Sequence, residues 1–190
     1  MLVNLKAIAH KVTDDELLEL SRDNPDTRFE TTKEGKLIIM SPTGSSTGEK
    51  NSSLLIQVGN WNLSTKKGKV FDSSTGFKFS DGAVRSPDVS WIKLERWNEL
   101  TQQQQDKFAP IDPDFVIELR SPTDRLDELR QKMIEYMDCG VCLGWLIDPI
   151  EKQVEIYRQG QDKEVLDNTK FKLSGEDILP NLTVDLTDIL

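Results

Sequence analysis

Two acidic side chains on predicted strands are the residues of this sequence best suited to chemistry. Asp88 lies in the segment Ser-Pro-Asp-Val-Ser-Trp at 86–91, and Glu118 lies in Phe-Val-Ile-Glu-Leu-Arg at 115–120. Carboxylates are depleted in strands, and a buried carboxylate without a partner is costly. The pair predicts a site for a hard divalent cation, because Mg²⁺ in proteins favours one or two carboxylates, with waters and substrate phosphate completing its octahedron.

Residues that follow Glu118 predict an anion-binding region beside this pair. Alternate residues of a strand point to the same side, so Arg120 is expected to share a face with Glu118. Ser121, Pro122 and Asp124 have the residue types of a helix start, and we expect a helix to begin at Ser121. Its free backbone N–H groups would attract a phosphate just beyond Glu118. With a cation that lowers the pKa of bound water, this arrangement predicts phosphodiester hydrolysis.

The segments that must position these residues indicate a mixed α/β protein. The apolar run at 115–119 predicts a central strand covered on both faces, and 143–147 predicts a second buried strand. The segment 153–158 alternates polar and apolar residues, which predicts a half-exposed edge strand.

Local signals predict the remaining elements. Thr13 and Glu16 have the spacing of a capping box that opens a short helix. The pair Glu34-Gly35 predicts a hairpin turn between strands at 27–31 and 36–40. Apolar residues at helical spacing predict a further helix at roughly 48–62.

Length and composition indicate one domain. The 190 residues show no linker, repeat or boundary, so we expect a single domain over 1–190, with 1–26 as a helical N-terminal extension. No stretch has the apolar length of a membrane span. The N-terminal residues lack the layout of a secretory signal. These features predict a soluble, cytoplasmic protein without a membrane partner.

The formal charge of −9 is the main argument against a general nucleic-acid binder, whose surface is usually basic. Net charge governs solubility and non-specific binding, however, and a site can be locally basic. A bound metal would add positive charge that the sequence count omits. Cys139, Cys142 and the single histidine are too few to supply the four ligands of a structural zinc site.

An ordered series of motifs resembles the Uma-two family, a large group of restriction-endonuclease-like proteins within the PD-(D/E)xK nuclease superfamily. The series runs over most of the chain, from about Phe29 to the C-terminus. Its motifs are Pro87-Asp88, Glu118-Leu119-Arg120-Ser121-Pro122, Lys132-Met133-x-x-Tyr136, Gly144-Trp145-Leu146-Ile147-Asp148-Pro149 and Val154-x-Ile156-Tyr157.

This resemblance implies a restriction-endonuclease-like fold, in which helices flank a central mixed β-sheet. It implies that Asp88 and Glu118 bind Mg²⁺ or Mn²⁺. The superfamily pattern places a lysine where this chain has Arg120, which cannot act as a base but can hold a phosphate oxygen. Lys132, on the following helix, is the natural substitute. Glu30 resembles a recurring acidic position and is a candidate accessory group for metal or water, or else an exposed strand glutamate.

The site residues also have structural interpretations. Lys132 stands four residues after Glu128, the favourable spacing for an ordinary solvated helix pair. Glu118 could serve only as the partner of Arg120 or Lys132. Asp88, after a proline, could be a turn residue that precedes its strand.

The leading hypothesis is a Mg²⁺-dependent endonuclease that acts on DNA. In it Asp88 and Glu118 are metal ligands, Lys132 activates or orients the attacking water, and Arg120 contacts phosphate. A homodimer is expected, because duplex DNA presents two matching strands. The alternatives are a catalytically inactive nuclease-fold module for protein binding or assembly, and a hydrolase of small phosphoesters.

Overall fold

A six-stranded sheet forms the centre of the protein in the computed structural model, which describes residues 11–167 and 172–190. Its strands are β3 (Gly68–Asp72), β6 (Val89–Lys93), β7 (Phe115–Leu119), β8 (Leu143–Asp148), β9 (Gln153–Arg158) and β10 (Glu164–Asp167). The strand order is β10-β9-β8-β7-β6-β3, with β7 and β8 parallel and the other neighbours antiparallel. The two most apolar strands therefore lie in the middle, as predicted, because parallel strands need cover on both faces.

The prediction that 153–158 forms an edge strand is wrong. β9 pairs with β8 on one side and with β10 on the other, so the edges of this sheet are β10 and β3. The alternating pattern led to the wrong prediction because Glu155, which was expected to face solvent, is buried and forms ion pairs. Glu155 accepts hydrogen bonds from Arg130 at 2.6 Å and from Lys163 at 2.7 Å.

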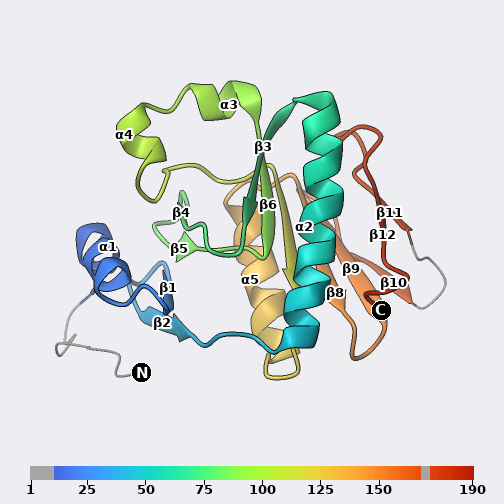
Figure 1. Cartoon of the computed structure of the whole chain (residues 1–190), viewed down its shortest axis with the longest axis horizontal. Helices are drawn as coiled ribbons and strands as arrows, with labels where there is room; N and C mark the ends of the chain where they lie inside the picture. The colour runs from blue at the N-terminus through green and yellow to red at the C-terminus, as the bar shows by residue number, and fades with distance from the viewer. Residues whose placement is uncertain (1–10, 168–171) are drawn as a thin grey trace.

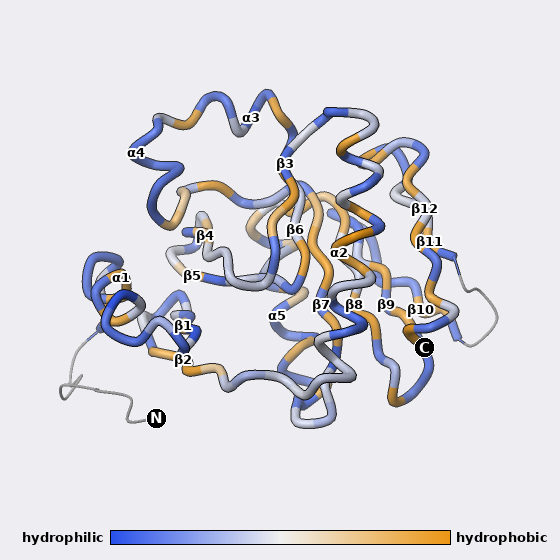
Figure 2. The backbone as a smooth tube through the Cα atoms, in the orientation of Figure 1, coloured by the Kyte–Doolittle hydropathy of each residue, from blue (hydrophilic) through white to orange (hydrophobic). Residues whose placement is uncertain are grey.

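Two long helices cover the two faces of this sheet (Figure 1). The described residues form the helices α1 (Asp14–Asp23), α2 (Ser45–Thr65), α3 (Leu94–Asn98), α4 (Gln102–Gln105) and α5 (Leu126–Asp138). On one face, Leu54 of α2 belongs to the same buried cluster as Ile117. On the other, Met133 of α5 belongs to the cluster that contains Val116. Figure 2 shows hydrophobic colouring along β6 and β7, between these helices.

A smaller sheet adjoins the central one and carries part of the site. Its order is β2-β1-β5-β4, formed by β1 (Arg28–Thr31), β2 (Leu37–Met40), β4 (Phe77–Lys78) and β5 (Val84–Arg85). The predicted hairpin is confirmed: β1 and β2 pair antiparallel, and Gly35 adopts φ 78° in the turn between them. A third sheet has two strands, β11 (Lys172–Ser174) and β12 (Thr183–Asp185).

The N-terminal helix is confirmed within the described residues. The predicted capping box is present at the start of α1: the Glu16 N–H donates to Thr13 Oγ1 at 3.3 Å, and the Thr13 N–H donates to Glu16 Oε2 at 2.8 Å. Leu17 of this helix is buried with Phe29 and Val84 of the small sheet. The first ten residues of the expected extension lie outside the described part of the chain.

The prediction that a helix begins at Ser121 is wrong, because α5 begins at Leu126. Residues 121–124 form a turn in which the Ser121 N–H donates to Asp124 Oδ2 at 2.8 Å and the Asp124 N–H donates to the Ser121 carbonyl at 3.1 Å. The Asp124 side chain thus binds backbone locally, which is the way short polar residues compete with helix formation. No helix start therefore lies directly after Glu118.

Candidate active site

Asp88 and Glu118 come together at one end of the central sheet. β6 and β7 pair antiparallel, and the last pair of their register is Val89 with Ile117, so Asp88 and Glu118 are the residues that adjoin this pair. Asp88 Oδ2 also accepts a hydrogen bond from the backbone N–H of Leu119 at 2.8 Å. Asp88 itself lies in a bend one residue before β6, so the prediction that it lies on a strand is wrong and the interpretation as a residue that precedes its strand is confirmed. Its carboxylate nevertheless joins the ends of the two strands.

The Glu118 carboxylate is buried on the α5 side of the sheet. Its Oε1 lies 2.9 Å from Lys132 Nζ and accepts a hydrogen bond from the Tyr136 hydroxyl at 2.8 Å. Its Oε2 has no protein donor among the residues described. Burial raises the pKa of Glu118 to about 7 against the lowering effect of Lys132, with further raising contributions from Asp88 and Glu30. Concentrated negative charge at this position is what a bound cation would relieve.

Lys132 bridges two carboxylates from different sheets. Its Nζ lies 3.1 Å from Glu30 Oε1, besides its contact with Glu118. Burial opposes the ammonium charge, but Glu118 and Glu30 outweigh burial and raise the pKa of Lys132. Lys132 is therefore a fixed cation at neutral pH and cannot serve as a general base in this state. The solvated pair with Glu128 is ruled out, because Glu128 pairs with Arg125 at 3.5 Å.

Glu30 reaches the site from β1 and is 2 % exposed, so the interpretation as an exposed strand glutamate is wrong. Its Oε1 accepts hydrogen bonds from Lys132 and from the backbone N–H of Ser86 at 2.8 Å, and its Oε2 accepts from Arg85 at 3.2 Å. Burial favours the neutral acid, yet Lys132 and Arg85 outweigh it and lower the pKa of Glu30. Glu30 is thus an ionised partner of Lys132.

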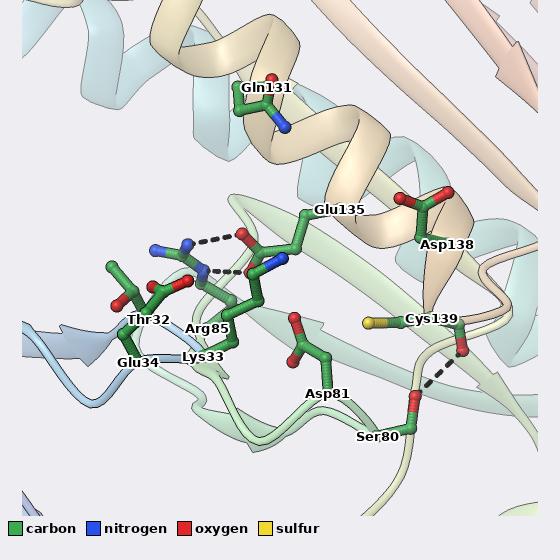
Figure 3. A pocket seen from close by; sticks show the side chains of 10 residues that line it. All are labelled: Thr32, Lys33, Glu34, Ser80, Asp81, Arg85, Gln131, Glu135, Asp138 and Cys139. Atoms are coloured by element: carbon green, nitrogen blue, oxygen red, sulfur yellow. Dashed lines mark hydrogen bonds and ion pairs between the residues drawn. The ribbon is translucent and has the colours of Figure 1, made fainter.

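Arg85 extends this network of charges towards a surface pocket. Its Nε and Nη2 each donate to Glu135 at 2.8 Å, in the fork geometry drawn in Figure 3. The pair lines a pocket of about 600 Å³, whose wall also carries Asp81 and Asp138. Neither Asp88 nor Glu118 lines this pocket. The chain of ion pairs therefore runs from its wall inward to the candidate site.

Arg120 has a different partner from the one considered above. Its Nη1 lies 2.7 Å from Oδ2 of the buried Asp148 on β8. Asp148 Oδ1 accepts hydrogen bonds from the backbone N–H groups of Ile150 at 2.9 Å and Glu151 at 3.2 Å. Arg120 thus neutralises a carboxylate that holds the turn after β8. Glu118 finds its own cation in Lys132.

Three residues of this region were not predicted from the sequence as site residues: Asn51, Arg85 and Tyr136. Asn51 Nδ2 donates to Asp88 Oδ1 at 3.0 Å. Sequence spacing could have identified two of the three. Tyr136 is four residues after Lys132 and so shares its helix face, and Asn51 is three residues before the buried Leu54. Arg85 offers no comparable spacing.

The residues present fit a divalent cation that keeps several waters. Within 11–167 and 172–190, no three His, Cys, Asp or Glu side chains gather as a metal site, and Cys139 and Cys142 are free thiols. Asp88 and Glu118 nevertheless offer oxygen ligands: among the described residues Glu118 Oε2 has no donor, and each Asp88 oxygen accepts a single hydrogen bond. Two carboxylates as protein ligands match the preference of Mg²⁺, which takes its other ligands from water and substrate. None of the described helices has the length and apolar character of a membrane span.

Comparison with known proteins identifies a family to which the chain is similar. Residues 14–187 match the model of the Uma2 family, described as "Putative restriction endonuclease". The crystal structure of a protein from Anabaena variabilis, described as a "putative nuclease belonging to DUF820", is 26 % identical, with a TM-score of 0.74. The alignment covers 93 % of this chain and 96 % of that one. No curated protein matches. The predicted architecture, a mixed sheet flanked by helices, is confirmed.

Proposed function

Because the chain belongs to the Uma2 family of restriction-endonuclease-like proteins, we propose that it is an endonuclease that uses Mg²⁺ or Mn²⁺ to hydrolyse phosphodiester bonds of DNA. The observation that carries the proposal is that Asp88 and Glu118 adjoin the last pair of two neighbouring strands, where Asp88 Oδ2 accepts a hydrogen bond from the Leu119 N–H. A cation held there would lower the pKa of a bound water and neutralise charge on the phosphate.

The protein side chains have separate roles in this proposal. Asp88 and Glu118 bind the cation, Glu118 through Oε2 and Asp88 through the lone pairs that its hydrogen bonds to Asn51 and Leu119 leave unused. Lys132, held as an ammonium by Glu118 and Glu30, orients the attacking water and stabilises charge that develops on the phosphate. Glu30 is a positioning residue, because its oxygens are occupied by Lys132, Arg85 and backbone.

Arg120 is proposed to contact a phosphate oxygen of the substrate. It follows Glu118 by two residues, and its side chain is 17 % exposed. Among the described contacts the bond to Asp148 uses Nη1, and Nε is buried, so Nη2 of the guanidinium fork remains for an anion. The net charge of −9 makes such local cations important, because long-range attraction of DNA is weak for an acidic protein.

Cleavage of supercoiled plasmid with Mg²⁺ or Mn²⁺ tests the function. The wild type should convert the plasmid to nicked and linear forms, and Asp88→Asn and Glu118→Gln should each reduce the rate by at least a hundredfold. Glu49→Gln is the matched control, because Glu49 is an exposed carboxylate on α2. Wild-type inactivity with both metals, or undiminished cleavage by the two variants, would refute the proposal.

We further propose that the enzyme acts as a homodimer on duplex DNA, because a two-fold assembly matches the two strands of its substrate. Sedimentation of the protein with and without a short duplex measures the assembly. Competition between duplex DNA and a nucleotide analogue separates DNA cleavage from hydrolysis of small phosphoesters. A protein that shows neither cation binding nor salt-dependent DNA affinity would instead be a binding module.

A further inference from the structure

Asn51 presents an unused oxygen next to the carboxylate pair. It lies in the second turn of α2, and its Nδ2 donates to Asp88 Oδ1 at 3.0 Å. Its Oδ1 is buried and has no hydrogen-bond partner in the described part of the chain. A buried amide oxygen without a donor is unfavourable, so its persistence beside Asp88 calls for a partner that the protein itself does not supply.

The orientation of this amide follows from its neighbour. The carboxylate of Asp88 offers only acceptors when it is ionised, and an amide turned the other way would set Oδ1 against another oxygen. The donor must therefore face Asp88, and Oδ1 must face elsewhere. The backbone N–H of Leu119 already binds the second oxygen of Asp88, so both Asp88 oxygens are held by donors.

Chemistry singles out Asn51 among the buried atoms that lack a partner. Four such side-chain atoms occur in the described residues: Asn51 Oδ1, Ser90 Oγ, Arg120 Nε and Trp145 Nε1. The arginine and tryptophan atoms are donors and cannot bind a cation, and a serine hydroxyl can rotate to donate. Asn51 Oδ1 is a pure acceptor, and amide oxygens are accepted ligands of hard cations.

We propose that Asn51 Oδ1 is the third protein oxygen for the divalent cation at Asp88 and Glu118, while its Nδ2 holds Asp88 in place. This inference rests on the proposed function and specifies the ligand set of the same site. It also explains how a site with only two carboxylates completes its protein ligands without a third acidic residue. The amide adds no negative charge to a region where Glu30, Asp88 and Glu118 already repel one another.

Titration with Mn²⁺ as the probe, followed by its electron paramagnetic resonance signal in the absence of DNA, separates the two functions of the amide. Asn51→Ala removes both the oxygen and the donor, whereas Asn51→Asp keeps an oxygen but loses the donor. If Oδ1 is a ligand, Asn51→Ala should weaken Mn²⁺ binding by about tenfold or more, and Asn51→Asp should bind at least as tightly as wild type.

Ser52→Asp is the control for added charge, because Ser52 is the next residue of α2 and is exposed. It should change the Mn²⁺ affinity by less than about threefold. Equal losses in Asn51→Ala and Asn51→Asp would overturn the inference, since the donor to Asp88 alone would then matter. Should Asn51→Ala not fold, the Mn²⁺ affinities of Asn51→Asp and Ser52→Asp still test the inference. An affinity of Asn51→Asp below that of the wild type would overturn it.

The outcomes also separate this inference from the function on which it rests. Mn²⁺ binding that Asp88→Asn abolishes and Asn51→Ala leaves intact would retain the two-carboxylate site and reject Asn51 as a ligand. A wild-type protein that binds no Mn²⁺ would reject both.

Discussion

The ammonium nitrogen of Lys132 lies 2.9 Å from Oε1 of Glu118, in a buried contact between α5 and the central strand β7. Lys132 is the residue proposed above to orient the attacking water, and Glu118 is one of the two proposed metal ligands. Removal of one partner of a buried ion pair leaves an uncompensated charge, which is more costly than the pair is worth. The pair therefore links the stability of the protein to its candidate chemistry.

Lys132→Met should destabilise the protein more at pH 8 than at pH 5. At pH 8 the variant buries the charge of Glu118 without its cation, and the expected loss is about 3 kcal/mol. At pH 5 Glu118, whose pKa is about 7 in the wild type, is protonated, and the loss should be smaller. Urea unfolding at the two pH values measures both losses. Equal losses at the two pH values would show that the stabilisation by Lys132 does not depend on the ionisation of Glu118.

The metal-free wild type should lose stability as the pH rises from about 4.5 to about 7. The folded pKa of Glu118, about 7, exceeds its ordinary value of 4.5, so the folded state binds more protons than the unfolded state in this window. The free energy of unfolding should fall by about 3 kcal/mol over that range. Glu118→Gln should flatten this part of the profile. If the free energy of unfolding of Glu118→Gln fell with pH as steeply as that of the wild type, Glu118 would not be the group responsible.

The affinity for the cation should rise with pH, whereas the stability of the metal-free protein should fall. Protons compete with the cation for Glu118, so Mn²⁺ affinity should rise by about tenfold between pH 6 and pH 7.5 and then level off. Calorimetric titration with Mn²⁺ at half-unit steps provides the measurement. A flat profile across this range would mean that the cation binds without Glu118.

Glu30→Gln should slow DNA cleavage by about tenfold with little change in Mn²⁺ affinity. Its oxygens are occupied by Lys132, Arg85 and the Ser86 N–H, so its loss misplaces Lys132 but removes no metal ligand. Rates on plasmid and Mn²⁺ titrations of the same preparation separate the two effects. A large loss of Mn²⁺ affinity would make Glu30 a ligand instead.

Tyr136→Phe should shift the pH dependence of cleavage to higher pH. The hydroxyl donates to Glu118 Oε1 at 2.8 Å, so its loss removes one stabiliser of the ionised carboxylate and raises the pKa of Glu118 further. The rate at pH 8.5 should stay close to that of the wild type. A uniform decrease at every pH would point to a structural role only.

The apolar strands and the position of the carboxylate pair could be predicted from the sequence. Glu118 stands out because charged residues are rare in such strands, and Asp88 stands out because it directly precedes one. The pairing of β6 with β7 brings the two residues to the same end of the sheet. The start of α5 could not be predicted, because Ser121, Pro122 and Asp124 have the residue types of both a helix start and a turn.

Contacts between residues far apart in the sequence could not be predicted either. Glu30 and Lys132 are 102 positions apart, and Asn51 and Asp88 are 37 apart, so no local spacing connects them. The edge assignment of 153–158 failed for a related reason. Alternation reveals two different faces of a strand, but a polar face can be buried by ion pairs such as those of Glu155.

Diffraction from crystals soaked in Mn²⁺, with data collected for the anomalous signal of manganese, locates the cation without any substitution. The proposed function predicts one strong anomalous peak between the carboxylates of Asp88 and Glu118, within about 2.3 Å of an oxygen from each. A peak elsewhere, or none at these two residues under saturating Mn²⁺, would contradict the two-carboxylate metal site.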